Sequence, residues 1–191
     1  MRVLGVCLAV LLLPGCATLN TVPKPVLLPD SPAAIKAWSM DGRIGVQSAE
    51  KAWQANLYWE HDPAQDRLRI SGPLSQGLVS IVVQKDLIFV NEGNGVTHLS
   101  RDPDGMLRQR LGFAVPLTSL RYWMLGVPDP DKSSLPMVGA GNTAGGFQQA
   151  GWQIYPDNLA SVDGWMLPQK LRAHGAGVKL KILADNWLLK D

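Results

Sequence analysis

Apolar and polar side chains alternate along much of the chain. From residue 38 to 46, and again from 53 to 60, the apolar side chains fall on every second position. This period is typical of a β-strand that buries one face. Short links that carry Gly, Pro, Asp or Asn join the earlier strands, so antiparallel neighbours are expected. The same pattern predicts further strands at 67–71, 79–83, 87–90, 147–155, 161–166 and 178–183.

Helical patterns occur at three places, two between predicted strands and one before the first strand. Asp102–Gly105, with the sequence DPDG, predicts the cap of a short helix that runs to Leu111. A compact apolar helix is predicted to begin at Pro116 and to end at Gly126. Ser31 followed by proline predicts a further helix start, with Ser31 as the N-cap. The helices are therefore few and short beside the strands.

These elements predict a mainly β fold with a few α-helices. A wide antiparallel sheet with one apolar face must curl or close, because exposed faces and edges favour aggregation. Two or three helices across its mouth would give an incomplete, half-open antiparallel β-barrel, covered by a helical lid and with a hydrophobic cavity inside. A filled sandwich without a cavity fits the periodicity equally well, so the pattern leaves both architectures open.

The first 16 residues have the pattern of a secretory signal. Arg2 precedes an apolar run from Val3 to Leu13, which is too short to span a bilayer. The sequence LPGC that ends at Cys16 resembles the lipobox of bacterial lipoproteins, whose cysteine receives a diacylglycerol and a further acyl group after cleavage. We therefore expect a lipoprotein signal peptide over residues 1–15 and lipidation of Cys16.

The next segment separates this anchor from the folded part of the chain. Residues 16–32 contain four prolines, and proline-rich segments are extended spacers. We expect a lipidated cysteine and a tether here, followed by one folded domain over residues 33–191. Ala17 differs from the aspartate that keeps many such lipoproteins at the inner membrane, which favours the outer membrane.

Composition excludes several classes of function. The 191 residues are 46% hydrophobic and 18% charged, and the formal net charge is only +2. So weak a charge gives no support to nucleic-acid binding. The two cysteines, Cys7 and Cys16, both lie near the N-terminus, so the folded domain has neither a disulfide nor a cysteine metal site.

No motif for catalysis or metal binding is found in the sequence. His61, His98 and His174 lie in or beside predicted turns, and their spacing does not fit a metal site. The aspartates at 102–105 and 129–131 lack the full ligand series of a calcium loop and suit turns and caps. We therefore expect no catalytic residue, no metal and no cofactor, and we do not expect an enzyme.

Eight segments, in order along the chain, resemble the LolB family of outer-membrane lipoprotein receptors, a branch of the LolA/LolB-like lipoprotein localisation proteins. They include WSMDGRIGV, WQANLYW and VPLTSLRYWMLGVP. Together with the lipobox, their order makes the resemblance specific, and it extends over nearly the whole of residues 33–191. The segments are Trp38–Val46, Trp53–Trp59, Gly72–Gly77, Val115–Pro128, Gly151–Tyr155, Leu167–Pro168, Val178–Ile182 and Asn186–Trp187.

The resemblance favours the half-open barrel with a cavity over the filled sandwich, and it implies a function. A protein of this family is a lipid-anchored outer-membrane receptor that faces the periplasm. It accepts acylated lipoprotein cargo from a LolA-like periplasmic carrier and inserts the cargo into the inner leaflet of the outer-membrane bilayer. We expect a monomer that needs no cofactor and does not bind nucleic acid.

The resemblance also implies roles for particular residues. In the family, a protruding leucine of the loop that matches Gly72–Gly77 assists membrane insertion, and Leu74 is the matching residue. The apolar stripes supply candidates for the lining of the acyl cavity, although core packing is the default interpretation of the tryptophans. These candidates are Trp38, Ile44, Val46, Leu57, Trp59, Ile70, Ile81, Trp123 and Met124.

Two other functions fit the same sequence. A lipid-anchored envelope scaffold would have a filled core and would bind only other proteins. A lipid-anchored hydrolase would need a serine, histidine and aspartate brought together in space, and the sequence gives no sign of such a set. Saturable binding of acyl chains separates the receptor from the scaffold.

Overall fold

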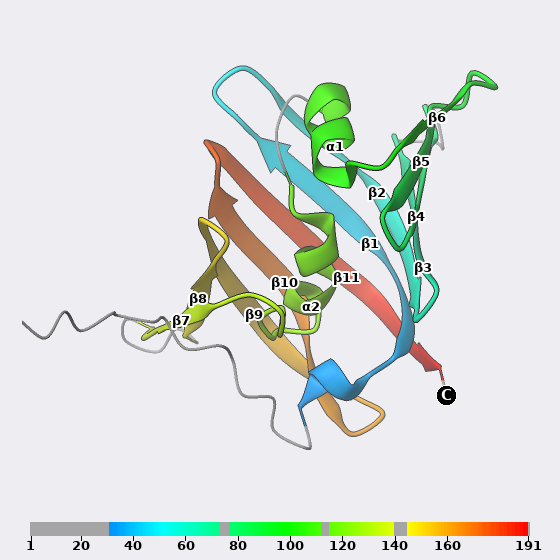
Figure 1. Cartoon of the computed structure of the whole chain (residues 1–191). Helices are drawn as coiled ribbons and strands as arrows, with labels where there is room; N and C mark the ends of the chain where they lie inside the picture. Colours follow the sequence, from blue (N-terminus) through cyan, green and yellow to red (C-terminus); the bar gives the residue numbers. More distant parts are fainter. Residues whose placement is uncertain (1–30, 73–76, 112–114, 140–144, 191) are drawn as a thin grey trace, which may run out of the picture.

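A single curved sheet with two α-helices against one face forms the body of the protein (Figure 1). The computed structural model describes residues 31–72, 77–111, 115–139 and 145–190. Eleven antiparallel strands lie in the order β6-β5-β4-β3-β2-β1-β11-β10-β9-β8-β7. Their bounds are β1 Ala37–Gln47, β2 Ala52–Asp62, β3 Gln65–Ser71, β4 Val79–Gln84, β5 Leu87–Asn91, β6 Thr97–Ser100, β7 Ser134–Met137, β8 Gly146–Gln149, β9 Trp152–Val162, β10 Trp165–Gly175 and β11 Val178–Lys190.

The order of the strands follows from chains of hairpins. Strands β1 to β6 pair in sequence order on one side, strands β7 to β11 pair in sequence order on the other, and β1 pairs with β11 between them. Within the described ranges, the edge strands β6 and β7 do not pair with each other, so the sheet stays open. The predicted mainly β, half-open antiparallel fold with a helical cover is confirmed. A sandwich of two stacked sheets is wrong, because all eleven strands belong to one sheet.

Three two-residue turns join the last four strands, and each ends in glycine. They are Ala150-Gly151, Asp163-Gly164 and Ala176-Gly177, with positive φ at both positions. Two positive φ values give the tight turn whose twist matches that of the flanking strands. The predicted strands at 147–155 and 161–166 each run through one of these turns, so both are wrong in extent.

The helices are short, and their ends follow the predicted signals. Helix α1 spans Pro103–Leu111, and the Gly105 N–H donates to Asp102 Oδ1 at 2.9 Å. Helix α2 spans Leu117–Met124, and Gly126 follows it with φ +80°. The predicted helix after Ser31 is only a 3₁₀ turn, because β1 already begins at Ala37. Among the described residues, no helix has the length and apolar character needed to cross a bilayer.

Gly42 lies where β1 and β11 change register. Asp41 pairs with Asn186 and Gly42 pairs with Ala184, so Asp185 is the extra residue of a β-bulge. A Cβ atom on Gly42 would overlap the carbonyl oxygen of Leu183. The close approach of the two central strands therefore requires glycine at this position.

Replacing Gly42 by alanine is expected to lower the free energy of unfolding by about 1–3 kcal/mol, because the added methyl group forces β1 and β11 apart. Gly45→Ala is the matched control on the same strand, since a Cβ atom there meets only the Lys181 oxygen at 4.0 Å. Urea denaturation of both variants measures the difference. Equal stability of the two variants would contradict this account of the bulge.

Candidate functional site

Apolar side chains from most of the strands face the two helices. The alternation along each strand places Trp38 and Val46 of β1, and Leu57 and Trp59 of β2, on this face. We call it the covered face, and its buried members are at most 5% exposed. The other strands contribute Leu68, Ile81, Val83, Ile88, Val90, Ile154, Leu167, Leu171, Leu180 and Ile182.

Three tryptophans meet at the end of the covered face where β1 begins. The ring centroid of Trp38 lies 5.2 Å from that of Trp59 and 5.2 Å from that of Trp187. Tilted and edge-on contacts of this kind stabilise aromatic clusters beyond the area that they bury. Trp187 is anchored in turn by its indole N–H, which donates to the Pro168 carbonyl oxygen at 3.1 Å.

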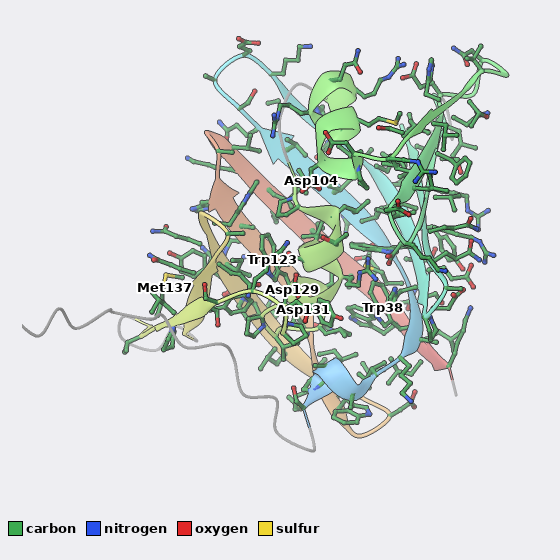
Figure 2. The ribbon with its side chains drawn as sticks, viewed as in Figure 1. Trp38, Asp104, Trp123, Asp129, Asp131 and Met137 are labelled. Carbon is green, nitrogen blue, oxygen red and sulfur yellow. The ribbon has the colours of Figure 1, made fainter. Side chains whose placement is uncertain are left out.

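Helix α2 presents its own apolar side to the sheet. Its buried residues include Leu120, Trp123 and Met124, and Figure 2 shows Trp123 in the middle of the molecule. The Trp123 ring lies 6.1 Å from that of Trp152, and its indole N–H donates to Gln149 Oε1 at 2.8 Å. The helix is therefore packed onto the sheet by apolar contacts and is oriented by a hydrogen bond to β8.

A buried polar network holds the loop after α2. Gln149 Nε2 donates to the carbonyl oxygens of Asp129 and Lys132, and its Oε1 also accepts from the Asp129 N–H. The Asp129 carboxylate accepts from the Ser119 hydroxyl at 2.7 Å, and its second oxygen accepts from the Asp131 N–H. The turn role expected for the aspartates at 129–131 is thus confirmed for Asp129.

A second polar cluster links α2 to the opposite half of the sheet. Asp66 of β3 is 1% exposed, and Trp59 Nε1 donates to its Oδ1 at 3.0 Å. His61 Nδ1 lies 2.8 Å from the same oxygen, and Arg121 Nη2 of α2 lies 3.0 Å from Oδ2. We call these four residues the Asp66 cluster. It satisfies a buried carboxylate and ties the helix to β3.

Most of the predicted cavity residues lie together on the covered face or on α2. Trp38, Val46, Leu57, Trp59 and Ile81 are buried on the sheet, and Trp123 and Met124 are buried on α2. Ile44 and Ile70 are half-buried and pack against the same core. Their role as an acyl-chain lining remains a prediction. Cys16 and Leu74 lie outside the described residues.

Two residues of the Asp66 cluster could have been found from the sequence, although the sequence analysis did not single them out. The strand predicted at 67–71 leaves Asp66 out, yet Asp66 lies in β3 and in phase with the inward residues Leu68 and Ile70. Arg121 lies four positions after Leu117, on the side of α2 that faces the sheet. A charged residue at an apolar position on each of two elements indicates a buried ion pair.

Asp104 of α1 is partly buried where the two helices meet. Burial raises the pKa of its carboxyl group, and a hydrogen bond from the Leu117 N–H offsets this only in part. The folded protein therefore binds this proton more tightly than the unfolded chain does. Its stability should rise as the pH falls from above the raised pKa towards the ordinary value for aspartate.

Replacing Asp104 by asparagine keeps a hydrogen-bond acceptor and removes the buried charge. We expect a melting temperature above that of the parent at neutral pH, and a gain that shrinks at mildly acidic pH. The exposed Asp41, changed to asparagine, is the matched control. Identical pH dependence of the two variants would show that the burial of Asp104 has no such effect.

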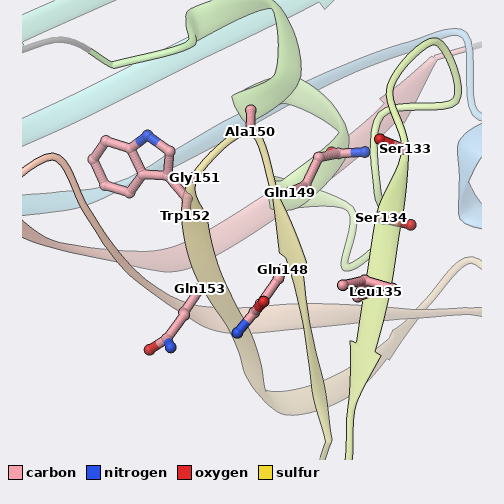
Figure 3. Close-up of a pocket in the computed structure, with 9 residues that line it drawn as sticks. All are labelled: Ser133, Ser134, Leu135, Gln148, Gln149, Ala150, Gly151, Trp152 and Gln153. Carbon is pink, nitrogen blue, oxygen red and sulfur yellow. The ribbon is translucent and has the colours of Figure 1, made fainter. Parts of the chain in front are cut away.

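The grooves at the surface differ in character from the covered face. A groove of 340 Å³ lies beside β7, β8 and β9, and Figure 3 shows that serines and glutamines line it together with Leu135 and Trp152. A groove of 570 Å³ where β1, β2, β10 and β11 lie together is lined by the basic residues Arg172, His174, Lys179 and Lys181 and also by Val46, Trp53 and Leu180. Both grooves therefore mix polar or basic residues with apolar ones, whereas the strand residues listed above for the covered face are all apolar.

The histidines of the described residues lie apart from one another. The three histidines lie in strands β2, β6 and β10, whereas turns were predicted at or beside them. Over the ranges that the structure describes, no three or more metal-ligating side chains come together. The candidate site is accordingly an apolar surface under two helices, oriented by two polar clusters.

Comparison with known proteins adds an independent finding. A family model described as "Outer membrane lipoprotein LolB" matches residues 36–187. The outer-membrane lipoprotein LolB of Pseudomonas paraeruginosa is 26% identical over 153 residues, 80% of this chain and 75% of that protein. That of Stutzerimonas stutzeri is 26% identical over 196 residues, 97% of this chain and 94% of that protein. The match to a solved LolA superfamily protein from Nitrosomonas europaea covers 83% of this chain and 88% of that protein, at 10% identity and a TM-score of 0.45.

Proposed function

The chain belongs to the LolB family of outer membrane lipoproteins, and we propose that it accepts acylated lipoproteins from a LolA-like periplasmic carrier and inserts them into the inner leaflet of the outer membrane. At the level of the family, it is a lipid-anchored outer-membrane protein that acts in lipoprotein localisation. Within the proposal, the acyl chains of the cargo bind on the covered face, beneath α1 and α2.

The continuous apolar surface of the covered face is the observation that carries this proposal. A lipoprotein with long acyl chains cannot cross water unaided, because each exposed methylene costs about 0.8 kcal/mol. A curved sheet lined by large apolar side chains can bury the acyl chains and so remove this cost. Transfer from carrier to receptor to bilayer then needs only increasing affinity along the route, without a cofactor or a covalent step.

The helices must move before an acyl chain can enter. Trp38 on the sheet and Trp123 and Met124 on α2 are at most 1% exposed, so no water-sized space adjoins these side chains. The structure therefore corresponds to a closed receptor in the proposed cycle. Opening would break the Arg121–Asp66 ion pair and the hydrogen bond of Trp123, and the acyl chains would replace the apolar contacts that the helices lose.

The anchor and the insertion loop complete the proposal. Lipidation of Cys16, at the start of the tether over residues 16–32, would hold the domain over residues 33–191 close to the bilayer. Leu74 would enter the membrane surface while the cargo leaves the covered face. Burial of a leucine side chain in hydrocarbon is worth about 1.5–3 kcal/mol, which suits a brief and reversible contact.

Depletion of the protein in its native bacterium tests the proposed function. We expect outer-membrane lipoproteins to accumulate in the periplasm as soluble complexes with the carrier, and fractionation followed by immunoblotting would detect them. A scaffold that only binds other proteins would leave these lipoproteins in the outer membrane after depletion. That outcome would overturn the proposal.

A further inference from the structure

Two buried hydrogen-bond donors, one on β1 and one on α2, have no partner among the described residues. The indole N–H of Trp38 and the Nε–H of Arg121 are buried, and neither has a hydrogen-bond acceptor within the described residues. A buried donor without an acceptor costs free energy, so each such group in a native protein requires an explanation. The other tryptophans of the buried clusters differ, because Trp59, Trp123 and Trp187 all donate to protein oxygens.

Both unpaired donors belong to the surroundings of the Asp66 cluster. Trp38 and His61 are register partners on β1 and β2, and His61 in turn pairs with Asp66 on β3. The Trp38 ring lies 5.6 Å from that of His61 and 5.2 Å from that of Trp59. Arg121 reaches the same aspartate from α2. One end of an otherwise apolar face therefore has two hydrogen-bond donors without an acceptor, while the Asp66 carboxylate there is already bound by Trp59, His61 and Arg121.

The chemistry of an acylated cysteine matches such a site. Each acyl chain begins at the carbonyl group of an ester or amide. The oxygen of this group accepts hydrogen bonds and carries no charge. We propose that Trp38 Nε1, with Arg121 Nε as a second donor, binds the carbonyl oxygens at the head of the acyl chains. This inference rests on the proposed function and adds the orientation of the cargo: the polar head lies at the Asp66 cluster and the tails extend along the covered face.

A comparison of ester and ether ligands tests this assignment. The probes are two lipopeptides with a diacylglyceryl-type cysteine and short eight-carbon chains, one ester-linked and one ether-linked, so that only the carbonyl oxygens differ. The strands and helices that the structure describes lie within residues 32–190, so the chain from residue 16 onward, with Cys16→Ser, contains all of them. We expect the ester to bind about two- to tenfold more tightly, the effect of one neutral hydrogen bond.

Trp38→Phe removes the donor and keeps an aromatic ring. In this variant the preference for the ester should fall, because only the Arg121 donor remains, whereas Trp187→Phe should retain it in full, because the Trp187 indole donates to Pro168 and not to the ligand. Isothermal titration calorimetry measures the six dissociation constants, for the two probes with the parent protein and each of the two variants. A preference that is undiminished in Trp38→Phe, or that is absent from the parent protein, would overturn the assignment.

A second measurement does not depend on the folding of a variant. In the parent protein, the NMR resonance of the Trp38 indole N–H should shift downfield with the ester probe and remain in place with the ether probe. Equal shifts with both probes would indicate that an ordered water or mere ring packing explains this donor, and would refute the inference. Failure of both probes to bind at all would instead contradict the proposed function itself.

Discussion

Replacing Asp66 by alanine is expected to lower the free energy of unfolding by about 3 kcal/mol, at the lower end of the range for a broken buried ion pair. The change leaves the Trp59 indole, His61 and the Arg121 guanidinium without their common acceptor. The Arg121 side chain is 23% exposed, and water that reaches it reduces the cost. Urea denaturation of the chain from residue 16, with Cys16→Ser, measures the effect.

The double variant Asp66→Leu with Arg121→Leu is the control for this prediction. Removing both charges avoids an uncompensated buried charge, so the double variant should be more stable than Asp66→Ala. It should also retain the fold, because leucine suits the apolar surroundings at both positions. A loss of less than about 1 kcal/mol in Asp66→Ala would mean that water, not the protein, satisfies this cluster.

Replacing Leu74 by glutamate is expected to reduce delivery of lipoproteins to membranes by about tenfold or more, because the apolar side chain that would enter the bilayer is worth about 1.5–3 kcal/mol. Acceptance of cargo from the carrier should not change, since Leu74 is not among the residues assigned to the covered face. The measurement uses a labelled lipoprotein on the carrier and follows its transfer first to the receptor and then to outer-membrane vesicles.

Leu78 offers a matched control for the Leu74 variant. It lies four residues later in the same link between strands and is 43% exposed, so Leu78→Glu adds the same charge nearby. Normal delivery by Leu78→Glu together with impaired delivery by Leu74→Glu would locate the effect at Leu74. Normal delivery by Leu74→Glu would remove the insertion role from the account.

The fold followed from local patterns wherever one face of a strand is buried. Alternation identified β1, β2 and the start of β11, and the DPDG cap and Gly126 marked ends of the two helices. The Asp163-Gly164 turn has the Asp-Gly dipeptide typical of a tight hairpin. Apolar Val162 and Trp165 border it directly, so the pattern predicted one continuous strand there. The turn at Ala150 had no such signal, because alanine seldom adopts positive φ and the neighbouring strands impose it there.

The candidate site was predicted in part. The residues of the covered face could be found because burial and alternation coincide, as at Leu57 and Trp59. The Asp66 cluster could not be assembled, because it joins β2, β3 and α2, and their spatial arrangement depends on how the whole sheet curves. The closed position of the helices was also inaccessible, since periodicity reports which side of an element is buried and not what covers it.

Acyl-chain binding by the soluble domain tests the central claim most directly. The chain from residue 16 onward, with Cys16→Ser, is titrated with the eight-carbon ester lipopeptide while tryptophan fluorescence is recorded. The account predicts saturable binding at one site with a change in tryptophan emission, because Trp38, Trp59 and Trp123 lie where the acyl chains would bind. The absence of saturable binding, with the protein folded, would contradict it.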